Sequence, residues 1–168
     1  MVQLIPDILA PEIKSPAERR LFIEFRDYIT SKKYIVLHSL GIAEHKNNIF
    51  GEIDFLILCN EGVLCLEVKG GEVSRGKGVW EFTNRYGKVS RKNEGPFQQV
   101  QGNMQSLLQY MRRRLGNYDP LARCQYACAV AMPDCKFKST GLGIDEIPEI
   151  LVDAKHPWDL DSLVKQAF

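Results

Sequence analysis

The sequence lacks the features that mark several broad classes of protein. No apolar run approaches the ~18 residues that a membrane-spanning helix needs, so we expect no membrane partner. The first residues show no basic stretch followed by an apolar core, and we expect no secretory signal peptide. The formal net charge is only +1, which argues against a globally basic nucleic-acid-binding protein but leaves room for a local basic patch.

Cysteine pairs of the kind that hold disulfides or zinc are also missing. The five cysteines are an odd number, and no two of them form a C-x-x-C motif. They are scattered through strand-like segments, where cysteine acts as a small apolar residue. This usage predicts reduced thiols in a cytoplasmic protein.

The composition is that of one globular domain. A chain of 168 residues with 45% hydrophobic content has the usual size of a single domain and can bury a sizeable core. It contains no internal repeat, low-complexity segment or linker. We therefore expect 1–168 to form one domain.

Apolar periodicity predicts several helices. The first is expected to begin at Ser15, which suits an N-cap, with Pro16 in the first turn and Glu18 at the capping-box position. Its expected apolar stripe consists of Leu21, Phe22, Phe25 and Ile29. A long helix is predicted at 96–115 and a final one at 159–167.

The remaining segments are predicted as strands and loops. Strands are expected at 34–38, 49–58, 63–69, 79–84, 88–91, 124–132 and 150–152. The other segments are expected to be an extended arm at 1–14, a polar loop at 45–48 and a mobile glycine-rich loop at 70–78. This order predicts an α/β or α+β fold in which helices flank a mixed central sheet.

Two acids stand out in the predicted hairpin of the second and third strands. Alternate residues of a strand share a face. If Leu58 pairs with Val63 across the turn, Asp54 falls directly opposite Glu67. A three-residue turn would shift this register by one residue.

Two facing carboxylates repel each other, so this arrangement needs an explanation. A raised pKa on one acid, the nearby Lys69 or a divalent cation would each relieve the repulsion. Alternatively, Asp54 and Glu67 are ordinary polar residues on a solvated strand face, and Glu52 forms a cross-strand ion pair with Lys69. From the residues alone both readings stay open.

Several motifs along the chain resemble one known family. The hairpin carries E-I-D, a turn with glycine, and E-x-K, all within 51–70. Four further motifs follow the same order as in the family: SPAE at 15–18, GVW at 78–80, PFQQ at 96–99 and MPD at 132–134. Together they resemble the nuclease-related domain (NERD) family of the PD-(D/E)XK nuclease superfamily, with a core at about 15–135 and a C-terminal extension at 136–168.

The resemblance implies a restriction-endonuclease-like core and a metal-dependent site. Asp54 and Glu67 would bind Mg²⁺ or Mn²⁺, with the backbone carbonyl of Val68 completing the site. Lys69 would orient the attacking water. Glu18 of the first helix would contact a metal-bound water or a second ion. It also suits the capping box of that helix, and it could serve in both roles.

The resemblance also suggests supporting residues. Gln99 corresponds to the glutamine of the family's later helix, whereas Gln101 lies nearer the predicted apolar stripe of that helix. Glu52 is expected to support the site by pairing with Lys69. Trp80 is expected to pack in the core or at its rim.

Basic residues cluster locally in spite of the neutral total charge. We expect the following to contact a phosphate backbone, unless they are only solvated surface charges: Arg75, Lys77, Arg85, Lys88, Arg91 and Lys92. The expected function is a metal-dependent nuclease acting on DNA, with RNA left open. The alternative is a non-catalytic DNA-binding or interaction module of a larger DNA-processing protein, since the family often carries helicase-type domains.

Overall fold

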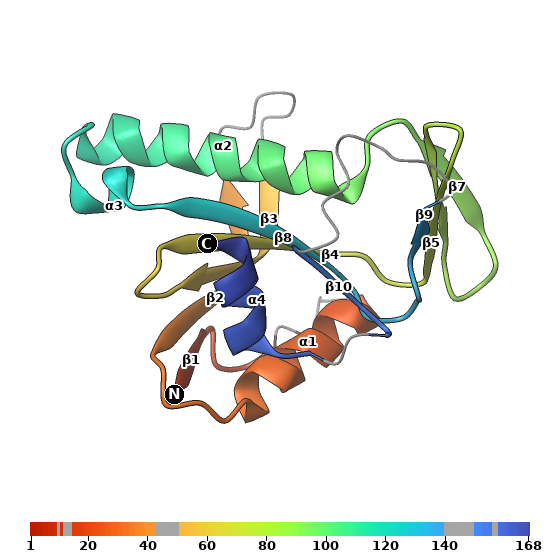
Figure 1. Ribbon diagram of the computed structural model, residues 1–168, viewed down its shortest axis with the longest axis horizontal. Helices are drawn as coiled ribbons and strands as arrows, with labels where there is room; N and C mark the ends of the chain where they lie inside the picture. Colours follow the sequence, from red (N-terminus) through yellow and green to blue (C-terminus); the bar gives the residue numbers. More distant parts are fainter. Residues whose placement is uncertain (10, 12–14, 43–50, 140–149, 156–157) are drawn as a thin grey trace.

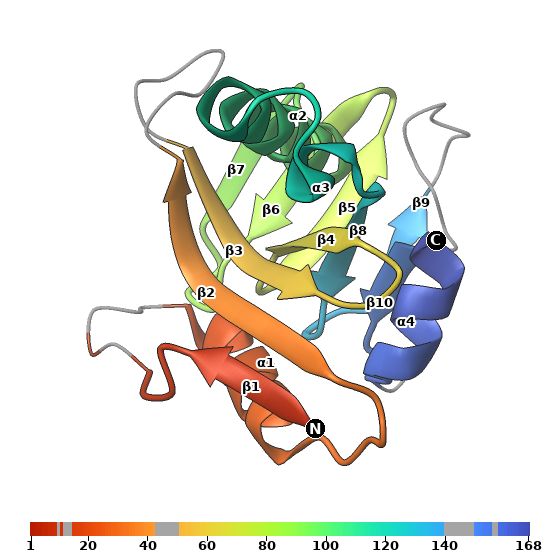
Figure 2. The same cartoon turned by 90° about the vertical axis from the view of Figure 1, so that its left-hand side faces the viewer.

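A six-stranded mixed sheet forms the centre of the molecule. The computed structural model of the chain describes residues 1–9, 11, 15–42, 51–139, 150–155 and 158–168. The strands of this sheet, in spatial order, are β1 (Val2–Ile5), β2 (Tyr34–Ile42), β3 (Gly51–Leu58), β4 (Val63–Val68), β8 (Tyr126–Met132) and β10 (Leu151–Asp153). β3 is antiparallel to both of its neighbours, while β4, β8 and β10 run parallel (Figures 1 and 2).

Helices cover both faces of this sheet. The long helix α2 (Pro96–Leu115) lies across one face, and α1 (Pro16–Asp27) and α4 (Leu160–Ala167) lie on the other (Figure 1). A short helix, α3 (Pro120–Arg123), follows α2. No helix among the described residues is long and apolar enough to cross a membrane. The predicted arrangement of helices flanking a mixed sheet is confirmed.

A second, four-stranded sheet projects from one end of the molecule. Its strands, in spatial order, are β7 (Val89–Lys92), β6 (Val79–Thr83), β5 (Glu72–Gly76) and β9 (Lys138–Ser139). β4 leads directly into this smaller sheet through Gly70 and Gly71 (Figure 1). The end of the E-x-K strand therefore lies at the junction between the two sheets.

Most of the predicted elements are confirmed. α1 begins after Ser15, whose Oγ accepts a hydrogen bond from Glu18 N at 3.3 Å, and α2 has the predicted bounds. The strands at 150–152 and 88–91 and the helix at 159–167 agree with β10, β7 and α4 within a residue or two. The polar loop predicted at 45–48 lies outside the described residues.

The mobile loop predicted at 70–78 is wrong. Glu72–Gly76 forms β5, which pairs antiparallel with β6 through a tight turn at Lys77 and Gly78. Both turn residues have positive φ, 51° and 81°, as a two-residue hairpin turn requires. The four glycines in this segment suggested mobility, whereas two of them serve tight backbone geometry.

Two predictions at the N-terminal end are also wrong in part. The arm predicted at 1–14 contains β1, which pairs parallel with β2, a contact between residues distant in sequence. Ile29 does not belong to the stripe of α1, because the helix ends when Tyr28 adopts an extended conformation. Ile29 is 96% exposed.

Candidate functional site

The two acids of the predicted hairpin lie side by side at the end of the β3–β4 ladder. The observed register pairs Leu58 with Val63, as predicted, and the ladder runs as far as Phe55. Asp54 and Glu67 come next on the two strands. The sequence therefore predicted the register that brings these acids together.

Beyond the ladder, the side chain of Asp54 continues the link between the strands. Its Oδ2 accepts a hydrogen bond from Val68 N at 2.7 Å. This bond fixes the carboxylate against the end of β4 and uses one of its two oxygens. The other oxygen can accept from a further partner.

Glu67 is buried and paired with the lysine two residues later. Lys69 Nζ lies 2.5 Å from Glu67 Oε1, and both side chains project from the same face of the strand. Glu67 is only 2% exposed, so the alternative of an ordinary acid on a solvated strand face is wrong. A buried carboxylate with one cation beside it is more typical of a functional site than of a surface strand.

The predicted ion pair between Glu52 and Lys69 is wrong. Glu52 is exposed, and among the described residues it forms no ion pair with Lys69, whose partner is Glu67. The physical reason is that β3 and β4 separate beyond Phe55. Lys69 N then donates to Ala131 O of β8 at 2.8 Å.

Burial and neighbouring carboxylates raise the pKa of both acids. Desolvation is the largest cause for Asp54, followed by the charge of Glu67, and its pKa rises to about 8. Desolvation also raises the pKa of Glu67, against the opposing effect of Lys69. The charge of Glu18 raises the pKa of both acids, which places a third carboxylate near the pair.

Unpartnered buried polar atoms gather around these acids. Five such side-chain atoms occur among the described residues, and three of them belong to Glu67, His38 and Ser39. Ser39 lies across from Asp54, since the residues on either side of it pair with Phe55 and Ile53. Buried polar groups without partners are rare and often indicate a ligand site.

Ser39 and His38 were not predicted from the sequence. Ser39 has a φ of 53°, which is strained for a residue other than glycine, and such strain concentrates at functional sites. The one sequence feature that could have drawn attention to them is that two polar residues, His38 and Ser39, interrupt an otherwise apolar strand segment. Neither burial nor strain is visible in the sequence.

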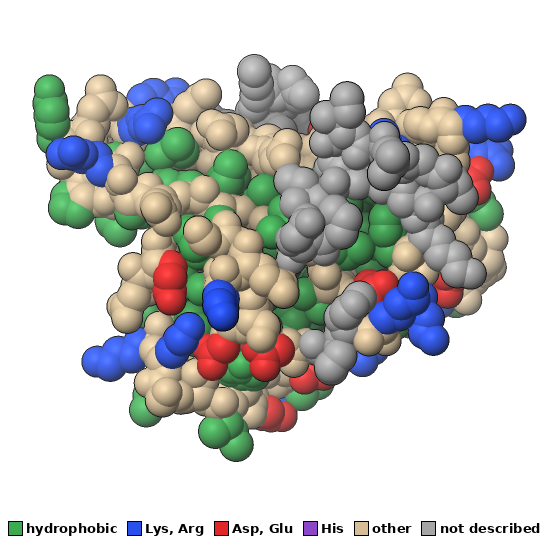
Figure 3. All heavy atoms as spheres, in the orientation of Figure 1, with side chains coloured by type: hydrophobic (Ala, Val, Ile, Leu, Met, Phe, Trp, Pro, Cys, Tyr) green, Lys and Arg blue, Asp and Glu red, His purple; other side chains and the backbone are tan. Residues whose placement is uncertain are grey.

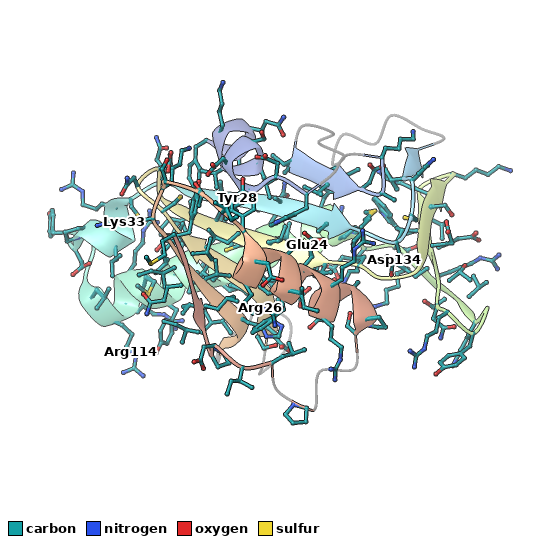
Figure 4. All side chains as sticks on the ribbon, turned by 90° about the horizontal axis from the view of Figure 1, so that it is seen from below. Glu24, Arg26, Tyr28, Lys33, Arg114 and Asp134 are labelled. Carbon is teal, nitrogen blue, oxygen red and sulfur yellow. The ribbon has the colours of Figure 1, made fainter. Side chains whose placement is uncertain are left out.

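The N-terminal end of α1 points toward the junction of the two sheets. A Cβ atom on Gly70 would lie 3.1 Å from Ala17 Cβ and 3.2 Å from Asp134 Oδ2, so α1, the end of the hairpin and the turn after β8 converge here. Figure 4, a view from below, shows α1 in front of the sheet, with Asp134 near its N-terminal end. Glu18 therefore both follows the N-cap and lies beside the acid pair.

The residues present fit a hard divalent cation. Among the described residues, no three His, Cys, Asp or Glu side chains form a metal cluster. The carboxylates of Asp54 and Glu67 lie next to each other, and Mg²⁺ commonly takes one or two carboxylates together with water and substrate oxygens. Glu67 Oε2 is a buried acceptor without a partner, which a cation would satisfy.

The structure separates the two candidate glutamines on α2. Asn103 donates its Nδ2 to Glu52 O at 2.9 Å, so this side of α2 faces the start of β3. Gln99 lies four residues earlier and therefore on the same side of the helix. Gln101 instead lines a groove with Cys128. Neither glutamine hydrogen-bonds to Asp54 or Glu67 in the described part of the chain.

The six basic residues predicted to contact DNA all lie in the smaller sheet or its turns. Arg75 and Lys92 both pair with Trp80 across strands and so share its face, and Arg75 lies 5.2 Å from the Trp80 ring centroid. Arg91 lies on the opposite face and pairs with Glu81 at 2.5 Å. The predicted patch is therefore divided between two faces.

The other three cations of this set lie in the two hairpin turns. Lys77 is in the β5–β6 turn, and Arg85 and Lys88 flank the β6–β7 turn. Arg85 stacks on the neighbouring Tyr86 at 4.8 Å. Figure 3 shows Lys and Arg side chains over this sheet and over the C-terminal end of α2.

The raised pKa of Asp54 predicts how stability depends on pH. The folded protein keeps a proton that the unfolded chain loses, so the stability of the metal-free protein falls as pH rises from about 4 toward 8. We expect Asp54→Asn to raise the melting temperature at pH 8 by an amount on the order of 4–8 °C, equivalent to about 2 kcal/mol.

Thermal melts of both proteins at pH 5 and pH 8, with a chelator present, check this expectation. The gain should shrink at pH 5, where Asp54 is protonated in the folded protein. An equal gain at both pH values would mean that the charge of Asp54 does not destabilise the fold.

Of the comparisons with known proteins, one gives a match. No curated protein and no solved structure matches the chain. The family model for the nuclease-related domain matches residues 14–131, more than half of the chain, and this range includes α1, the acid-bearing hairpin, α2 and most of β8. The chain therefore belongs to the nuclease-related domain family, within the PD-(D/E)XK nuclease superfamily.

Proposed function

We propose that this chain is a metal-dependent nuclease that hydrolyses phosphodiester bonds in DNA. The observation that carries the proposal is the pair of the half-buried Asp54 and the buried Glu67 beside Lys69, at the junction of the two sheets. Retaining two desolvated acids with raised pKa destabilises the fold unless another charge compensates them. A divalent cation at these carboxylates is the compensation that also serves the family's chemistry.

Asp54 and Glu67 would hold the cation through their carboxylate oxygens, with the Val68 carbonyl as a further ligand. When bound, Mg²⁺ or Mn²⁺ supplies Lewis-acid charge at the scissile phosphate. Asp54 is preorganised for this role by its bond from Val68 N. Glu18 adds negative charge beside the pair.

Lys69 would act on the reacting groups themselves. Its ammonium now rests on Glu67 Oε1 and keeps 23% of its side chain exposed, so it can reach a bound phosphate. From there it would orient the attacking water and stabilise the negative charge that develops on the phosphorane. Such preorganised charge often supplies a large part of catalysis.

Incubating the protein with plasmid, linear duplex and single-stranded DNA, with Mg²⁺ or Mn²⁺, tests the function. We expect cleavage that a chelator abolishes. Binding of DNA without cleavage under every condition would contradict the proposal and favour the alternative, a non-catalytic binding module.

The two faces of the smaller sheet allow a matched test of the DNA contacts. Trp80 packs against Phe97 of α2, so its face, which carries Lys92, is directed toward the main body. We expect Lys92→Ala to weaken DNA binding and to lower the slope of log affinity against log salt by about 1. Arg91→Ala should change little, because Arg91 already pairs with Glu81 on the other face.

Filter-binding titrations across salt concentrations measure both effects. The neighbouring positions make each variant a control for the other. Equal losses in the two variants, or a flat salt response of the wild type, would contradict this placement of the DNA.

A further inference from the structure

His38 is a buried polar residue whose ring packs between aromatic side chains. Its ring stacks on Phe55 with centroids 4.6 Å apart and meets the edge of Phe22 at 5.4 Å. The side chain is only 1% exposed, and Nε2 forms no hydrogen bond. A phenylalanine could provide the same packing, so packing alone does not explain the polar atom.

A charged group, the carboxylate of Glu18, lies near this nitrogen. His38 Nε2 lies 3.7 Å from Glu18 Oε2, slightly beyond hydrogen-bond length. Glu18 is 19% exposed in its side chain and is therefore within reach of solvent. Without a partner, its carboxylate would gain hydration and rotamer freedom by turning outward.

Turning outward would move Glu18 away from the acids. Its charge raises the pKa of both Asp54 and Glu67, so its present position adds to the negative potential of the site. His38 approaches Glu18 from the α1 side of the sheet, since Phe22 is a residue of α1. The imidazole is thus placed to hold Glu18 at the acid pair.

We propose that His38 is a positioning residue that holds Glu18 against Asp54 and Glu67, and so strengthens the binding of a divalent cation. The inference rests on the proposed function for its consequence, but the His38–Glu18 contact exists in the metal-free protein. Residues that orient a charged group near a metal site commonly change metal affinity by about 10–100-fold.

Nuclear magnetic resonance of the metal-free protein tests the contact by itself. Long-range ¹H–¹⁵N spectra report the two imidazole nitrogens, and His38→Phe identifies the signals of His38 among the three histidines. We expect Glu18→Gln to shift the Nε2 signal of His38. An unchanged signal would overturn the proposal whether or not the protein is a nuclease.

Calorimetric titration with Mn²⁺ tests the consequence. His38→Phe keeps the ring packing and should weaken Mn²⁺ binding about 10-fold, whereas His38→Gln, which keeps an N–H near the position of Nε2, should recover most of it. The double variant His38→Phe/Glu18→Gln should bind no more weakly than Glu18→Gln. Wild-type affinity in His38→Phe, or losses that multiply in the double variant, would overturn the proposal.

The two measurements separate two kinds of failure. If the wild type binds no Mn²⁺ and cleaves no DNA, the proposed function fails, and the metal-binding consequence of His38 fails with it. If the wild type binds Mn²⁺ and cleaves DNA, but the His38 variants bind Mn²⁺ as tightly as the wild type, the proposed function stands and the role of His38 fails.

Discussion

Asp54→Asn should reduce Mg²⁺-dependent DNA cleavage by a factor on the order of 10³, equal to about 4 kcal/mol in transition-state free energy. The asparagine can still accept the hydrogen bond from Val68 N, but it lacks the negative charge that would hold the cation. Lys69→Ala should cause a loss on the order of 10²–10³-fold, because it removes a charge placed at the reacting phosphate. Initial cleavage rates on linear duplex at saturating Mg²⁺ measure both.

Measuring the stability of these variants shows whether the activity is lost through catalysis or through unfolding. Asp54→Asn is expected to melt above the wild type at pH 8, so unfolding cannot account for its inactivity. Glu61→Gln is a matched control, because Glu61 is an exposed acid in the turn of the same hairpin and pairs only loosely with Lys32 at 3.7 Å. Cleavage that persists in both Asp54→Asn and Lys69→Ala would refute the site.

Gly95→Ala should cause the largest loss of stability. A Cβ at Gly95 would lie 2.3 Å from both Cε2 and Nε1 of Trp80, which is fully buried against Phe97 and Phe137. Overpacking of this kind costs about 1–3 kcal/mol or more, so the melting temperature should fall by roughly 2–4 °C for each kcal/mol. The indole cannot move away without disturbing the rings beside it.

Gly41→Ala provides the control for this substitution. A Cβ at Gly41 meets no atom within 4 Å, so we expect a change within about 0.5 kcal/mol. Thermal and denaturant unfolding of both variants measure the difference. If Gly95→Ala has the same melting temperature as the wild type, the tight packing between the start of α2 and the smaller sheet does not contribute to stability.

Several features of the fold could be predicted because they depend on neighbours in sequence. The bounds of α2 follow from apolar spacing over five turns, and the start of α1 follows from Ser15 and Pro16. β5 could not be predicted in this way. Only Val73 of that strand is apolar and buried, and its pairing depends on β6 and on the distant β9.

The sequence by itself indicated the hairpin register that the structure has, and with it the meeting of Asp54 and Glu67, because strand pairing across a short turn depends on neighbouring residues. Only the tertiary structure decided which partners these acids have. Lys69 pairs with Glu67 and not with Glu52 because β4 leaves β3 for β8 at this point. His38 meets Glu18 because α1 packs beneath β2. Burial, which raises the pKa of both acids, arises only when helices and sheets close around them.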